Sequence, residues 1–288
     1  MINHAKQIWL NTEEKNQYAE VAHTFYLSEP VSNVILEIYC ETEYVVQING
    51  KFTGGGQYKS YENKRVYDSY DVTSFLKKGE NAIFIIAYHQ GLNSLTYACG
   101  KAGVAFALGT SAKQYALSGA DSKIRPCALY RSGEGVELTT GQIGYTYHYD
   151  AAAKPLPWQN ARIVECNSPF EKRPVMKLEY QSVVCGKICA QGYLKRETCL
   201  TAAENMQIDY LSCRDKNEIF DGMRIKKNPD GVYFVLDLGN EYAGLFTMTL
   251  RAGAGTEIDI GYGEHLDDLR VRTYGGARHF ASNYRCCD

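Results

Sequence analysis

Five residues in the first third of the chain have side chains that could bind a sugar. They are Asn49, Tyr58, Tyr61, Tyr67 and Asp68. The apolar C–H face of a sugar stacks on aromatic rings, and its hydroxyl groups bond to amide and carboxylate groups. The same residue types are also typical of tyrosines packed across neighbouring strands beside a turn. The pattern therefore indicates a candidate carbohydrate site and leaves cross-strand packing open.

An acidic cluster lies near the end of the chain, where Glu264, Asp267 and Asp268 surround His265. Calcium prefers several oxygen ligands, so this cluster is a candidate calcium site. A catalytic carboxylate pair is a second interpretation, and a solvated loop after a strand is the third. We favour the solvated loop, expect no cofactor and no metal ligand set, and keep calcium as the one cation to test.

The ten cysteines are scattered and include no CxxC pair. Cys185, Cys189 and Cys199 have no histidine nearby and fit no common zinc spacing. The chain is also long enough to fold without disulfide staples, so we expect reduced structural thiols. The histidines, of which His89 is one, are far apart and indicate no ligand set.

Two further features could be taken for binding motifs. The tryptophans Trp9 and Trp158 could each stack on a sugar, although burial is the commoner fate of a tryptophan. Gly54-Gly55-Gly56 is followed by no Lys-Ser/Thr pair and has no GxGxxG spacing, so it is not a phosphate loop. We interpret it as a turn that uses the conformational freedom of glycine.

The elements that must position these residues are mostly strands. Apolar and polar residues alternate over Thr42–Ile48, and Asn49-Gly50 follows at once, which predicts a strand and a tight hairpin turn. Ala82–Tyr88 is a continuous apolar run and predicts a covered strand. Alternation also predicts strands at Tyr145–Tyr149, Phe246–Leu250 and Ile258–Tyr262. Short helical turns are expected at Val72–Lys77, capped by Asp71, and at Thr201–Tyr210.

Short strands separated by Gly and Asn turns predict an all-β protein of two tandem antiparallel β-sandwich domains of the jelly-roll type. We place the first sandwich at residues 1–165, a linker with two prolines at 166–175, and the second sandwich at 176–288. The final strand, Arg278–Cys287, has no partner after it. Because an unpaired strand exposes backbone donors and acceptors, either it pairs far upstream or the natural polypeptide continues. We expect the second sandwich to be truncated at its C-terminal end.

Composition excludes several functions. The formal net charge is −2, which argues against nucleic acid and anionic membranes as partners. No apolar run reaches the roughly 18 residues of a membrane span. The first residues lack the apolar segment of a signal peptide, so a cytoplasmic location is expected.

Several segments together resemble the N-terminal, non-catalytic region of bacterial α-L-rhamnosidases, glycoside hydrolase family 78. Tyr44–Gly50 (YVVQING) with Val66–Asn81 is similar to the first, galactose-binding-like sandwich of that family. Asp230–Gly244 with Gly253–Asp268 follows the order of four spaced elements in the second sandwich. Leu269–Tyr284 resembles a subset of the family.

The resemblance implies a catalytic (α/α)6 barrel after the second sandwich, which carries the glutamates that act as general acid and general base and inverts the anomeric centre. Long amphipathic helical pairs do not occur in this sequence, so no catalytic residue is assigned and the chain alone is expected to be inactive. The implied partners are that barrel, in the same polypeptide, and rhamnosylated glycans or glycosides. A freestanding carbohydrate-binding module and a structural scaffold without ligand are the alternatives.

Overall fold

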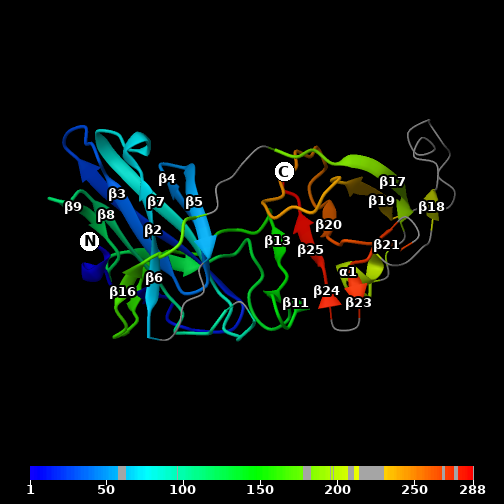
Figure 1. Ribbon diagram of the computed structural model, residues 1–288, viewed down its shortest axis with the longest axis horizontal. Coiled ribbons are helices and arrows are strands. Elements are labelled where there is room, and N and C mark those ends of the chain that lie inside the picture. Colours follow the sequence, from blue (N-terminus) through cyan, green and yellow to red (C-terminus); the bar gives the residue numbers. More distant parts are fainter. Residues whose placement is uncertain are drawn as a thin grey trace. The chain divides into compact units, whose positions relative to one another are not determined.

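The computed structural model describes the chain except for residues 58–62, 96, 178–182, 195, 197, 207–210, 214–229, 268–269, 276–277 and 288. It is an all-β protein, as predicted, and it divides into two compact units (Figure 1). The first unit comprises residues 1–136, 141–145 and 153–176. The second comprises residues 137–140, 146–152 and 177–288.

The first unit is a sandwich of two sheets. In the part of the chain that the structure describes, one sheet has seven strands, in the order β15 (Arg162–Ile163), β1 (Ile8–Trp9), β8 (Val104–Gly109), β3 (Ile35–Cys40), β6 (Arg65–Asp71) and β16 (Phe170–Lys172), with β9 (Gln114–Leu117) paired to β8. The other has six, in the order β14 (Gln159–Asn160), β10 (Lys123–Pro126), β2 (Gln17–Leu27), β7 (Gly79–His89), β4 (Glu43–Ile48) and β5 (Lys51–Gln57).

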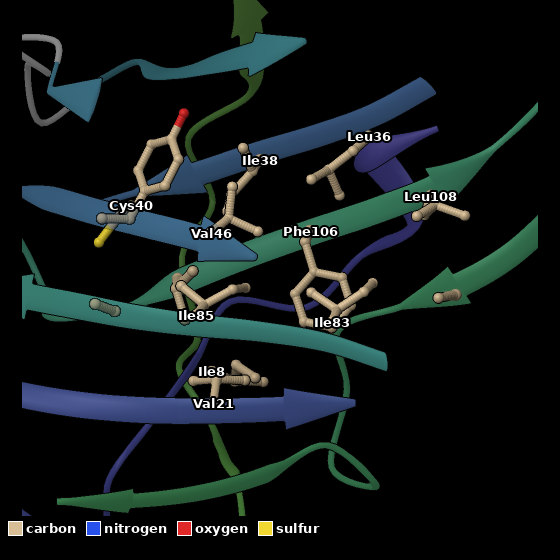
Figure 2. Close-up of a cluster of buried hydrophobic side chains, with 14 of the residues drawn as sticks. Ile8, Val21, Leu36, Ile38, Cys40, Val46, Ile83, Ile85, Phe106 and Leu108 are labelled. Carbon is tan, nitrogen blue, oxygen red and sulfur yellow. The ribbon is translucent and has the colours of Figure 1, made fainter. Parts of the chain in front are cut away.

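The core lies between these two sheets because each central strand turns alternate side chains inward. On β7, Ile83 and Ile85 are buried, whereas the intervening Phe84 is only half-buried. Figure 2 shows Ile83 beside Phe106 of β8, and Ile85 and Leu108 belong to the same buried cluster. The strand predicted at Ala82–Tyr88 is therefore confirmed, but it is fully covered on one face only. Each such side chain contributes roughly 1.5–3 kcal/mol by leaving water.

The β4–β5 hairpin turns at Asn49 and Gly50, as predicted. Their φ angles of 52° and 75° are both positive, which the tight hairpin requires and which these two residue types tolerate. The interpretation of Gly54-Gly55-Gly56 as a turn is wrong, because all three glycines lie inside β5. At Gly54 the reason for glycine is a close approach: an added Cβ would lie 2.3 Å from the Tyr70 ring.

Helical structure is short in both units. The predicted turn after Asp71 is a 3₁₀ helix, η2 (Thr73–Phe75), and the Asp71 carboxylate accepts a bond from Thr73 N at 2.9 Å. A second 3₁₀ turn, η1, covers Ile2–His4. The segment Thr201–Tyr210 contains α1 (Ala202–Asn205), which begins with a capping box formed by Thr201 and Glu204. Among the described residues, no helix is long and apolar enough to cross a membrane.

The second unit consists of small sheets, and its strands are described by their pairings. One sheet has the order β13 (His148–Asp150), β25 (Ala281–Arg285) and β20 (Glu257–Gly261), and another has the order β18 (Leu211–Cys213), β17 (Lys187–Leu194) and β19 (Gly231–Asp237). Two hairpins are β21–β22 (Leu266–Asp267, Arg270–Val271) and β23–β24 (Tyr274–Gly275, Arg278–His279). β11 (Leu138–Thr140) belongs to this unit, and β12 (Gly144–Tyr145) belongs to the first.

The final strand has partners on both sides. β25 runs antiparallel to β20 and parallel to β13, which lies more than a hundred residues upstream. β25 thus pairs with a distant upstream strand. The central position of β25 also leaves no backbone edge open along these paired residues.

Two further expectations differ from the structure. The alternating segment Phe246–Leu250 forms no strand, and Phe246 is 52% exposed. Alternation predicts a strand only where a partner strand and a covering layer are supplied, and no described strand pairs with this segment. Residues 166–175, expected to form a linker, contain β16, which pairs in parallel with β6 of the first unit.

Candidate functional site

The predicted sugar-binding residues do not come together in the described structure. Tyr58 and Tyr61 lie outside the described residues. Asn49 lies in the β4–β5 turn, where its amide nitrogen donates to Phe75 O and Asn81 Oδ1, each at 2.9 Å. Its amide oxygen accepts from Ala82 N at 3.0 Å. The side chain of Asn49 thus bonds the turn to neighbouring segments.

Asp68 faces the interior of the sandwich, and its two carboxylate oxygens bind different partners. Arg173 Nε donates to Oδ1, and the Tyr44 hydroxyl donates to Oδ2. The Tyr44 hydroxyl also lies 2.8 Å from that of Tyr70, which in turn donates to Gly55 O at 3.1 Å. Burial raises the pKa of Tyr44, and the Asp68 carboxylate raises it further. This network joins β6 of one sheet to β4 and β5 of the other.

Tyr67 lies one position away on β6 and therefore faces the opposite side of the sheet. It packs against a small cluster that includes Ile2, Tyr39 and Ala105. Burial raises the pKa of Tyr67, with a smaller contribution from Glu37. The three described candidates therefore occupy a turn, the sandwich interior and the outer face of a sheet, and a sugar site made of them stays a prediction.

Sequence reasoning missed Glu41, a buried carboxylate of the first unit whose oxygens bond to four neighbouring groups. Glu41 lies in the turn between β3 and β4, is 2% exposed, and accepts four hydrogen bonds. Oε2 accepts from the Thr42 hydroxyl at 2.8 Å and lies 2.6 Å from His89 Nδ1. Oε1 accepts from Gly100 N at 2.6 Å and from the Tyr97 hydroxyl. A carboxylate offers about four lone-pair sites, so Glu41 is saturated.

The imidazole of His89 completes this buried cluster. Its Nε2 lies 3.8 Å from Oε1 of Glu13, and its ring meets that of Trp9 edge to face at 6.2 Å. Burial raises the pKa of Tyr97, and Glu41 raises it further, so this phenol stays a donor. A carboxylate that orients an imidazole is also found in catalytic triads, but here every Glu41 lone pair is used within the fold. The cluster holds the loop after β7 against the β3–β4 turn.

The alternation along β7 indicates that His89 points into the sandwich. Ile83, Ile85 and Ala87 alternate inward along β7, and the next inward position is His89. A histidine on the apolar face of a strand requires a polar partner, which could have been sought. Nothing in the sequence shows that this partner is Glu41, because the pairing depends on β4 lying beside β7.

The other candidates are distributed as follows. Trp9 is buried, but Trp158 is 40% exposed and the Arg125 guanidinium lies 4.1 Å from its ring centre, so burial was the wrong expectation for Trp158. In the acidic cluster, Glu264 and His265 are exposed, and Asp268 lies outside the described residues. No group of three His, Cys, Asp or Glu residues within the described part of the chain is arranged to hold a metal.

The nine cysteines that the structure describes are free thiols, as predicted. Cys40 and Cys127 are buried, and burial raises the pKa of Cys40 to about 12 and that of Cys127 to about 11. A thiol with so high a pKa is a poor nucleophile at neutral pH, so these two cysteines are part of the packing.

Solved structures with a similar fold are α-L-rhamnosidases. The GH78 rhamnosidase of Bacillus sp. GL1 has a TM-score of 0.61 and 22% identity over 68% of this chain. The α-L-rhamnosidase of Aspergillus terreus has a TM-score of 0.59 and 16% identity over 99% of this chain. That of Streptomyces avermitilis, solved with L-rhamnose, has a TM-score of 0.56 and 17% identity over 94% of this chain.

The fold is one found in α-L-rhamnosidases. This confirms the structural resemblance expected from the sequence. The match covers 22%, 31% and 25% of those three chains, so this chain spans about a quarter of their length. No protein-family model matches the sequence, and no curated protein matches it.

Proposed function

We propose that this chain is the accessory β-sandwich region of an α-L-rhamnosidase-like glycoside hydrolase. The observation that supports this most is that 99% of the chain can be superposed on part of the Aspergillus terreus α-L-rhamnosidase. The order of sequence elements over Asp230–Gly244 and Gly253–Asp268 supports the same family independently. In this role the chain braces an (α/α)6 barrel, which removes terminal α-L-rhamnose with inversion, and holds carbohydrate near it.

Catalysis by the barrel, and not by this chain, follows from the chemistry. Inverting hydrolysis needs two carboxyl groups that face each other across a sugar, one protonated and one positioning a water molecule. Glu41 is a buried carboxylate, but its oxygens already accept four bonds. Asp68 is likewise bonded to Arg173 and Tyr44. We therefore assign neither residue a part in glycoside cleavage.

The coding DNA beyond the codon for Asp288 tests the proposal directly. An open frame of several hundred codons that encodes helical hairpins supports it. The complete product should then hydrolyse an aryl α-L-rhamnoside, and purified residues 1–288 should not. Cleavage of that substrate by residues 1–288 alone would contradict the assignment of catalysis to the barrel. A stop codon at this point would make a freestanding carbohydrate-binding module the leading function.

Rhamnosylated glycans or glycosides are the proposed carbohydrate partners. The Streptomyces avermitilis enzyme was solved with L-rhamnose, and we extend that ligand to this chain as part of the proposal. Titration of residues 1–288 with L-rhamnose, with and without calcium, separates a binding module from a scaffold. Loss of binding in Tyr61→Ala or Tyr67→Ala would support the site predicted from the sequence. A flat titration at millimolar sugar would leave the scaffold role.

A further inference from the structure

A polar cavity in the first unit is lined by residues that have not been discussed so far. Its volume is about 330 Å³, within the range of small-ligand pockets. It is lined by residues of β9, the strand paired to β8 in the seven-stranded sheet. The side chains that matter for its chemistry are His4, His23, Gln114, Tyr115, Ser118 and Asp121.

Backbone contacts fix the wall of this cavity around Ser118. The Ser118 hydroxyl donates to Lys6 O at 2.7 Å and accepts from Phe106 N at 3.0 Å. The backbone of Ser118 also bonds to Phe106 and Lys6, at 2.9 and 3.0 Å. Gln114 Nε2 donates to Met1 O at 3.3 Å. The first residues of the chain and the β8–β9 hairpin are thereby held together, so the cavity is formed before any ligand arrives.

His23 of β2 is one of the residues that line the cavity. Its Nδ1 lies 3.4 Å from the Ser122 hydroxyl, and its ring meets Phe106 edge to face at 5.5 Å. No hydrogen bond between described residues uses its Nε2. Burial lowers the pKa of His23, against an opposite effect of Asp121, which favours the neutral form of the ring. A neutral imidazole carries one donor and one acceptor.

Three other polar groups of the cavity make no hydrogen bond with a described residue. They are the Tyr115 hydroxyl, the Asp121 carboxylate and the Gln114 amide oxygen. Tyr115 packs its ring partly against the core, which fixes the position of its hydroxyl. Asp121 is exposed at the mouth, so water solvates it in the absence of a ligand. The cavity therefore combines fixed donors and acceptors with one aromatic ring.

This combination selects the class of ligand. The Asp121 carboxylate repels phosphate and sulfate, and no group of three His, Cys, Asp or Glu residues in the described part of the chain is arranged to hold a metal ion. Donors and acceptors within one small space suit a molecule whose every hydroxyl can both donate and accept. We propose that this cavity binds a neutral pyranose. The choice of a sugar over other hydroxyl-rich molecules rests on the proposed function. Asp121 accepts from sugar hydroxyls, and Tyr115 and His23 bond to the same ring from the inner side.

Saturation-transfer NMR and calorimetry on residues 1–288 test this proposal with L-rhamnose and D-galactose as probes. Sugar is raised to roughly 50 mM, above the millimolar dissociation constants that correspond to about −4 kcal/mol. The variants Tyr115→Phe and Asp121→Asn each remove one bonding group and keep the shape of the side chain. Their matched controls are Tyr26→Phe, at a side chain that is 71% exposed, and Glu29→Gln, at another exposed surface site.

At least one of the two sugars should bind, and each cavity variant should weaken that binding by about three- to tenfold, the effect of losing one hydrogen bond. The controls should bind as the wild type does. Absence of binding by both sugars, or equal binding by all variants, would overturn the proposal. Binding of sulfate in place of sugar would overturn the neutral ligand. A negative result here leaves the hydrolase assignment intact, because the coding DNA decides that separately.

Discussion

His89 Nδ1 lies 2.6 Å from Glu41 Oε2, although 48 residues separate the two in sequence. Both side chains are about 2% exposed. The pair joins the turn after β3 to the end of β7, and Glu41 extends the connection to Gly100 N in the following loop. A single carboxylate thus determines how three segments of the first unit meet.

Replacement of Glu41 should therefore destabilise the first unit strongly. Glu41→Ala leaves the imidazole of His89, the Tyr97 hydroxyl and Gly100 N without their acceptor. Removal of one partner from a buried bonded pair costs about 3–5 kcal/mol. Urea unfolding followed by tryptophan fluorescence measures this, because both tryptophans belong to the first unit. Glu134→Gln, in the exposed pair with Lys15, is the control and should leave the midpoint unchanged.

The sequence was sufficient where a local pattern has a local cause. Alternation over Thr42–Ile48 with Asn49-Gly50 defined a strand and its turn, because strand pleating and positive φ depend on neighbouring residues only. The strand Ile258–Tyr262 was found in the same way, with β20 at Glu257–Gly261. The antiparallel sandwich class followed from several such strands.

The sequence was insufficient where distant segments meet. The bonds of Glu41 and the cavity beside β9 are made by segments that approach only after the two sheets have formed. The need for glycine at position 54 shows the same limit, because it arises from the ring of Tyr70 on another strand. At Phe246–Leu250 the pattern was present, but no described strand pairs with it. Periodicity describes one face of a strand and does not show what covers that face.

Gly54→Ala tests the close approach at β5. The added methyl group would overlap the Tyr70 ring, whose hydroxyl is bonded to Tyr44 and Gly55. Overpacking of this kind costs about 1–3 kcal/mol. Gly141→Ala is the matched control, because a Cβ there meets nothing within 4 Å. Equal unfolding midpoints for the two variants would show that Tyr70 moves aside freely.

The stability of the first unit should fall in mild acid partly because of His23. Burial lowers the pKa of this imidazole below its ordinary value of 6.5, with Asp121 acting in the opposite direction. A lowered pKa means that the stability His23 contributes is fully present above pH 6.5 and is lost as pH falls through the folded pKa. Between roughly pH 7 and pH 5, His23→Gln should remove part of the decline, by at most about 1.4 kcal/mol per pH unit.

Unfolding midpoints measured at several pH values in that range provide the test for His23. Gln114→Ala alters the same cavity without removing a titratable group and should retain the wild-type pH dependence. Parallel curves for His23→Gln and the wild type would show that the imidazole titrates equally in the folded and unfolded states.

Replacement of Asn49 should lower the free energy of unfolding by more than its positive φ angle alone would explain. Asn33 and Asn49 both have positive φ, at 55° and 52°. Among the described residues, the Asn49 side chain bonds to Phe75, Asn81 and Ala82, whereas the Asn33 side chain makes no hydrogen bond. Asn33→Ala therefore measures the cost of the conformation, and Asn49→Ala adds the lost bonds, an extra loss of about 1–3 kcal/mol. If both variants lose the same free energy of unfolding in urea, water has replaced the Asn49 side chain as the bonding partner of Phe75, Asn81 and Ala82.

The variants Tyr44→Phe and Tyr67→Phe test the two faces of β6 separately. Tyr44 of β4 bonds to Asp68 on the inner face of β6, and Tyr67 lies on its outer face. The Tyr44 hydroxyl bonds to Asp68 and Tyr70 between the sheets, so its removal takes one donor from the buried Asp68 carboxylate. A loss of about 1–2 kcal/mol is expected, because a buried acceptor loses its donor. Tyr67→Phe should stay within a few tenths of a kcal/mol, as surface-side hydroxyl deletions do. Each variant removes one phenolic hydroxyl. A comparable loss in the free energy of unfolding for Tyr67→Phe would therefore show that the Tyr67 hydroxyl also stabilises the fold.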